Sequence, residues 1–80
     1  MAVSTSKVVA YVLIVTDVGK EHDIADGLLK INGIVKTNVV YGEFDVIAEI
    51  NCSDLKSLDQ TITKLRKNSS VIRTSTLISS

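Results

Sequence analysis

Few side chains of this chain could do the work of a catalytic or metal site. The sequence has one histidine, His22, and one cysteine, Cys52, and these two cannot supply the ligands of a structural zinc site. The carboxylates of Asp45 and Glu49 fall on one expected strand, about 13 Å apart at the usual rise per residue. They are too widely spaced for the close carboxylate pair of a retaining glycosidase. We therefore expect no enzyme activity, no bound metal and no cofactor.

One enzyme class stays open as an alternative, a small dimeric α+β-barrel enzyme that encloses a pocket between paired sheets. Such an enzyme usually needs a cluster of His, Tyr or Trp side chains. His22 falls in the first turn of an expected helix and faces outward, as an inert surface histidine does. Cys52 lies between a strand and a helix cap, where a small, partly buried residue is expected.

The elements that position these residues are organised around a β-hairpin, with strands expected at residues 34–41 and 44–51. Two apolar, β-branched runs flank Gly42 and Glu43, and a glycine at the first position of a two-residue loop suits a type II′ turn. The facing pairs are then Tyr41–Phe44, Val39–Val46, Thr37–Ala48 and Val35–Ile50 on the helix side, and Val40–Asp45, Asn38–Ile47 and Lys36–Glu49 on the other.

The remaining elements follow from the period of the apolar residues. Residues 8–15 are apolar at odd-numbered and even-numbered positions alike. This pattern is typical of a strand that is buried on both faces at the centre of a sheet. Residues 20–31 have a helical period, and Asn32-Gly33 is the expected stop of this helix. Gly27 is an unfavourable mid-helix residue, which close packing on the sheet would explain. Ser53 or Asp54 caps a second helix, and residues 71–78 form an edge strand. The expected buried stripes are Ile24, Ala25, Leu28 and Ile31 on the first helix, and Leu55, Leu58, Ile62 and Leu65 on the second.

The order strand, helix, hairpin, helix, strand predicts an α+β fold, a ferredoxin-like βαββαβ sandwich. Its four-stranded antiparallel sheet has two helices on one face, with the first and third strands central. We expect a single domain over residues 7–79, preceded by a short flexible N-terminus, residues 1–6. Two short helices cover only one face of the sheet, and an exposed apolar face usually marks an interface. The sequence therefore predicts a homodimer formed sheet against sheet.

Composition narrows the functions that this fold can host. Nine basic residues balance nine acidic ones, so the chain lacks the positive surface that nucleic-acid binding needs. An RNA-recognition module also needs aromatic side chains on the open sheet face, whereas the expected register turns Tyr41 and Phe44 toward the helices. A metal chaperone needs paired cysteines. A lone cysteine, no signal peptide and no apolar run long enough to span a bilayer indicate a cytoplasmic protein.

The chain resembles the ligand-binding domain, or RAM domain, of the Lrp/AsnC family of amino-acid-responsive regulators. The motifs occur in the family's order and extend from about Lys7 to Ser79. They are Ala10-Tyr11-Val12-Leu13-Ile14, Gly19-Lys20-Glu21, Ile31-Asn32-Gly33-Ile34-Val35, Tyr41-Gly42-Glu43-Phe44-Asp45 and Arg73-Thr74-Ser75-Thr76-Leu77-Ile78. The chain is similar to members that consist of this domain alone, without the helix-turn-helix, so we expect no direct DNA binding.

The resemblance implies an amino-acid sensor that modulates transcription through full-length Lrp/AsnC regulators. It also implies dimers that assemble further, into octamers or decamers, with ligands held between dimers. A structural oligomerisation partner that binds no ligand is the alternative within the family. Carried over from the family's motifs, the ligand-binding residues are Gly42, Glu43, Phe44, Asp45, Thr74 and Thr76.

Overall fold

The chain forms six elements, which a computed structural model describes over residues 7–79. Their order is strand, helix, strand, strand, helix, strand, and this confirms the predicted ferredoxin-like α+β fold. The predicted flexible N-terminus, residues 1–6, lies outside the described residues. The elements are β1 (Val8–Thr16), α1 (Glu21–Leu28), β2 (Ile34–Val39), β3 (Val46–Cys52), α2 (Leu55–Arg66) and β4 (Val71–Ser79).

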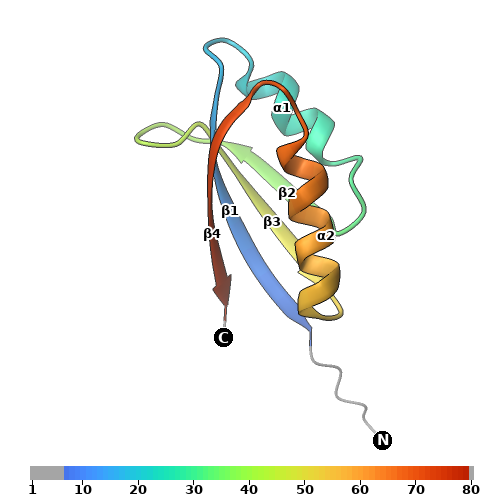
Figure 1. Cartoon of the computed structure of the whole chain (residues 1–80). Coiled ribbons are helices and arrows are strands. Elements are labelled where there is room, and N and C mark those ends of the chain that lie inside the picture. The colour runs from blue at the N-terminus through green and yellow to red at the C-terminus, as the bar shows by residue number, and fades with distance from the viewer. Residues whose placement is uncertain (1–6, 80) are drawn as a thin grey trace, which may run out of the picture.

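The four strands make one antiparallel sheet in the order β2-β3-β1-β4, so the first and third strands are central, as predicted. Both helices lie on the same face, α1 against β2 and β3 and α2 against β3 and β1 (Figure 1). The opposite face, here called the open face, carries no helix formed by residues 7–79. The core between sheet and helices consists of Ala10, Val12, Ile14, Ile24, Ala25, Leu28, Ile34, Val46, Ala48, Ile50, Leu58 and Leu65.

The two helices differ from the sequence prediction at their margins. Helix α1 ends at Leu28, and Ile31 packs against the core from the turn that follows. Gly27 is exposed, and a Cβ added there would meet nothing within 4 Å, so close packing on the sheet does not explain this glycine. In α2, Leu55 is 61% exposed and does not join the apolar stripe, while Thr61 is buried.

The hairpin has the predicted register from Val39–Val46 to Lys36–Glu49, but a bulge follows. Ile34 pairs with Ile50 in place of Val35, which is 52% exposed. Strict alternation would have buried Val35 together with Thr37. The extra residue of the bulge turns the larger Ile34 into the core, where it is 6% exposed. The predicted Val35–Ile50 pair is therefore wrong.

The predicted two-residue turn is also wrong, because the strands end early and leave a loop of residues 40–45. The Val40 N–H donates to the Asp45 carbonyl oxygen at 2.9 Å, so these two residues face each other as predicted. A turn at Gly42 and Glu43 would instead have hydrogen-bonded Tyr41 to Phe44. Beyond the Val40–Asp45 pair the strands separate, and the loop projects from the sheet (Figure 1). Tyr41 is 96% exposed, so it does not face the helices as predicted.

Asp54 caps α2, as predicted, and accepts a hydrogen bond from the Ser57 N–H at 2.7 Å. This backbone bond, with the Ser57 side chain, lowers the pKa of the Asp54 carboxyl. A lowered pKa in the folded state stabilises the fold above the unfolded-state pKa, about 3.9, and this stability is lost as pH falls through the folded-state pKa. We expect Asp54→Ala to lower the Tm near neutral pH, and the difference from wild type to close in acid. Asp54→Asn, which keeps a cap without charge, should lack this pH dependence; equal Tm losses for Asp54→Ala at every pH would contradict the argument.

Candidate ligand-binding site

The Asp45 side chain is fixed at the point where the projecting loop returns to the sheet. Its N–H donates to the Ile14 carbonyl oxygen at 2.8 Å, and its Oδ2 accepts from the Thr16 N–H at 2.9 Å. These bonds continue the pairing of β3 with β1 beyond the last regular residue pair, Ile14–Val46. The carboxylate is half-buried and has lone pairs beyond the one that Thr16 uses. It is therefore an oriented acceptor at the base of the loop.

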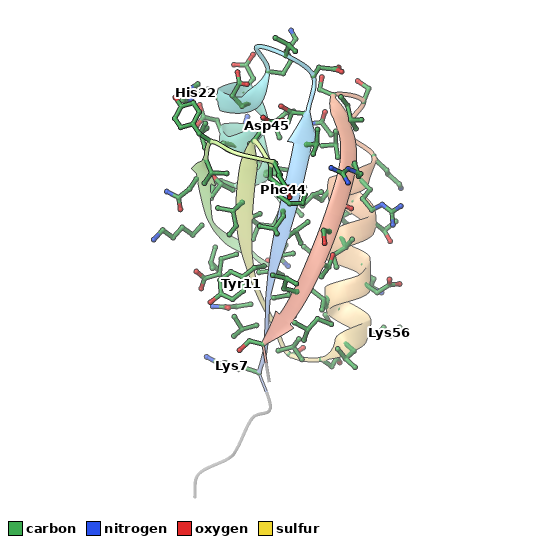
Figure 2. All side chains as sticks on the ribbon, turned by 90° about the vertical axis from the view of Figure 1, so that its left-hand side faces the viewer. Lys7, Tyr11, His22, Phe44, Asp45 and Lys56 are labelled. Atoms are coloured by element: carbon green, nitrogen blue, oxygen red, sulfur yellow. The ribbon has the colours of Figure 1, made fainter. Side chains whose placement is uncertain are left out.

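The other loop residues of the predicted site lie further out. Gly42 and Glu43 are exposed, and Gly42 has a φ of +138°, a backbone conformation that a side chain would strain. Phe44 is half-buried and lies over β1 on the open face (Figure 2). The Arg73 guanidinium stands 5.6 Å from the centre of its ring, within the range of a cation–π contact. The prediction that Phe44 faces the helices is therefore wrong.

Thr74 and Thr76 lie on the helix side of the edge strand β4, opposite Ile14 and Val12. Thr74 is half-buried and Thr76 is exposed. They share one strand face, as predicted, but β1 separates them from Asp45. Ile14 pairs with Thr74 on one side and accepts the Asp45 N–H on the other. Within one copy of the chain, β1 therefore lies between the loop residues of the predicted site and the two threonines.

The open face has a hollow of about 190 Å³ that the sequence analysis did not identify. The feature of the sequence that could have indicated this hollow is the predicted Lys36–Glu49 pair. In the structure these two residues face each other across β2 and β3. Tyr11 also lies on this face (Figure 2). With Phe44 and Tyr11 there, the open face does carry aromatic side chains, and only the balanced charge still argues against RNA recognition. The hollow is lined by Tyr11, Lys36, Asn38, Ile47 and Glu49.

The described residues hold neither a cluster of metal ligands nor a membrane-spanning helix. No three His, Cys, Asp or Glu side chains of residues 7–79 come together in a group that could hold a metal ion. Neither helix in this part of the chain is long and apolar enough to cross a membrane. His22 is exposed on α1, and Cys52 is half-buried, as predicted.

The fold and the loop together define the class of protein, a small ferredoxin-like α+β domain that presents an oriented carboxylate at the end of its central strands. A family model described as the Lrp/AsnC ligand binding domain matches residues 9–80. The chain belongs to this family. None of the curated protein sequences compared with the chain matches it.

Solved structures share this fold. Hypothetical protein PHS023 from Pyrococcus horikoshii is 42% identical, with a TM-score of 0.86 over 91% of this chain and 89% of that one. AsnC from E. coli is 16% identical, with a TM-score of 0.84, and the match covers 99% of this chain and 57% of AsnC. The transcriptional regulator NMB0573 of Neisseria meningitidis, solved as an L-Met complex, is 14% identical, with a TM-score of 0.79 over 91% of this chain and 49% of that one.

Proposed function

We propose that the chain is a regulatory module of the Lrp/AsnC type that binds an amino acid. Membership of a family of ligand-binding domains supports this function, and one neighbour in fold was solved with L-Met. The single observation that carries the proposal is the Asp45 carboxylate, which the Thr16 N–H orients at the base of an exposed loop. The module acts on transcription through full-length regulators of the family, in the cytoplasm.

The chemistry of an α-amino acid fits the six residues of the proposed site. The Asp45 carboxylate accepts hydrogen bonds from the ammonium group, and backbone N–H groups around Gly42 approach the carboxylate group closely because glycine has no side chain. The hydroxyls of Thr74 and Thr76 supply further donors. Since β1 separates the threonines from Asp45, two copies of the chain contribute to each site. Glu43 and Phe44 line the loop side of that site.

The open face supports a dimer in which two sheets pack against each other. Neither α1 nor α2 covers this face (Figure 1), and the odd-numbered residues of β1 supply an apolar row along its centre. Ile47 of β3 and Leu77 of β4, which is 55% exposed, continue this surface on either side. Burial of a contiguous apolar face is the main driving force of association. Further assembly of such dimers, into octamers or decamers, places ligands between them.

A thermal-shift screen of the twenty amino acids tests the proposed function. An amino acid at a hundred times its Kd should stabilise the protein by about 2.7 kcal/mol. We expect Asp45→Asn to keep the fold, because its amide oxygen still accepts from the Thr16 N–H, and to lose the shift, because the negative charge is gone. Asp45→Ala should also lose this hydrogen bond, at a cost of about 1.5–3 kcal/mol to the free energy of unfolding.

Asp26→Asn is the matched control, because it removes the same charge from an exposed position of α1. It should leave the amino-acid response unchanged. If no amino acid shifts the Tm while the oligomer persists, the chain is a structural oligomerisation partner without a ligand. An unaltered response in Asp45→Asn would remove Asp45 from the site.

A further inference from the structure

A second hollow, of about 240 Å³, lies at the opposite end of the sheet from the projecting loop, and the proposed amino-acid site does not use it. It lies between the segment before β2, the end of β3 and the side of α2 that runs from Ser57 to Lys64. The length of β3 separates it from Asp45, about 20 Å at the usual rise per residue. We call it the polar pocket; it is lined by Asn32, Gly33, Asn51, Cys52, Ser53, Ser57, Gln60, Thr61 and Lys64.

The floor of the polar pocket is held in one conformation by contacts between three segments. The Thr61 hydroxyl, in a residue 6% exposed, donates to the Asn32 carbonyl oxygen at 3.2 Å. The Asn51 N–H donates to the Gly33 carbonyl oxygen at 2.9 Å. A Cβ on Gly33 would lie 2.8 Å from Thr61 Oγ1, so the turn before β2 approaches α2 as closely as a glycine allows. The backbone at the floor of the pocket is therefore fixed before a ligand binds, and the exposed side chains of Asn51, Ser53, Gln60 and Lys64 surround it.

One side of α2 faces this pocket with polar groups instead of apolar ones. Ser57, Gln60, Thr61 and Lys64 follow each other at helical spacing, beside the apolar positions Leu58 and Leu65. Amide and hydroxyl groups from the two adjoining loops complete the lining. The pocket thus offers many hydrogen-bond donors and acceptors and little apolar surface, which suits a small, heavily hydrogen-bonded molecule.

The charge of the residues that line the polar pocket narrows the class of ligand that it could bind. Lys64 is the single Lys, Arg, His, Asp or Glu among the nine residues that line the pocket. Its ammonium favours one anionic group, and no carboxylate of the lining set is present to pair with a ligand ammonium. This distinguishes the polar pocket from the Asp45 site, which accepts an ammonium.

From this lining we infer that the polar pocket is a second ligand site, which binds a small hydroxylated carboxylate. The ligand's carboxylate pairs with Lys64, and its hydroxyl groups exchange hydrogen bonds with the side chains of Gln60, Asn51 and Ser53. The site is independent of the proposed amino-acid site and remains if that proposal fails.

Glycerate and propionate are the two probes, because they have the same carbon number and charge and differ in hydroxyl groups. We expect millimolar glycerate to shift the backbone NMR signals of Asn51, Cys52, Ser53 and Ser57, and not those of residues 40–45. Propionate should bind more weakly. Lys64→Gln should weaken glycerate binding about tenfold, the effect of losing one charge-assisted hydrogen bond.

Lys56→Gln is the matched control, since Lys56 is exposed on the same helix and does not line the pocket (Figure 2). It should leave glycerate binding unchanged. The inference is overturned if glycerate shifts no signal of the polar pocket, if it binds no better than propionate, or if both lysine variants weaken it equally. A failure of the amino-acid site would instead appear as unshifted signals of residues 40–45 in the presence of amino acids.

Discussion

Leu13→Lys is expected to dissociate the protein into monomers. Leu13 lies on the open face at the middle of β1, between Ile47 of β3 and Ser75 of β4. In the proposed dimer it is at the centre of the packed sheets, where an unpaired ammonium would be buried. Burying such a charge costs several kcal/mol, and each 1.4 kcal/mol weakens association about tenfold. Light scattering over a dilution series should show the dimer in the wild type and monomers in the variant.

Leu29→Lys is the control for this experiment. Leu29 is 48% exposed at the C-terminal end of α1, in the helix layer and away from the open face. The chemical change is the same, and a lysine at a helix C-terminus is favourable. Circular dichroism should show both variants folded, because neither side chain belongs to the core. A wild type that is monomeric at micromolar concentration, or a Leu13→Lys variant that stays dimeric, would contradict the proposed sheet-to-sheet interface.

Gly33→Ala is expected to lower the free energy of unfolding by about 2–5 kcal/mol, combining backbone strain and overpacking. Gly33 has a φ of +103°, and an added Cβ would lie 2.8 Å from Thr61 Oγ1 and 3.6 Å from Cys52 Sγ. Thr61 cannot move away freely, because it is buried and its hydroxyl is bonded to the Asn32 carbonyl oxygen. In a domain of this size the loss corresponds to a Tm lower by about 10 °C or more.

Gly27→Ala is the matched comparison, because the chemical change is identical and the expected sign is opposite. Gly27 lies in α1 with nothing within 4 Å of an added Cβ, so alanine should stabilise the protein by about 0.5–1 kcal/mol. Thr61→Ala separates the steric cost of an added Cβ at Gly33 from the cost of backbone strain. In the Thr61→Ala background, Gly33→Ala should lose its steric cost and keep its strain. A double-mutant cycle of urea denaturation measures the difference between the two free energies of unfolding. A Gly33→Ala variant as stable as wild type would refute both parts.

The sequence predicted the fold and the sheet order because the apolar periods of the strands and helices are local and strong. The sequence-based prediction of which residues are buried was wrong where two local preferences compete. At the start of β2, alternation favoured Val35 in the core, and the bulge buried Ile34 in its place. At the second helix, Leu55 had the right spacing but lies in the first turn, where it is exposed.

The candidate site was less predictable, because its geometry depends on contacts between distant parts of the chain. The hydrogen bond between Asp45 and Thr16 joins residues 29 positions apart, so the local sequence around the hairpin does not indicate it. Phe44 also owes its position to a distant residue, because its contact with Arg73 draws it over the open face. The polar pocket has no local signal either, since Thr61 belongs to a helix stripe at a position that usually carries an apolar residue.

The place of β4 in the sheet has a consequence for the order in which this domain folds. Its pairing with β1 joins residues as far apart as Val9 and Ser79, and no helix packs on it to the extent that the helices pack on the other strands. Contacts of such long separation form late and slow the folding of small domains. Until β4 has been synthesised and paired, one edge of the most apolar strand offers its free N–H and C=O groups to other chains. The newly made protein is therefore most prone to aggregate in the interval before its last strand arrives.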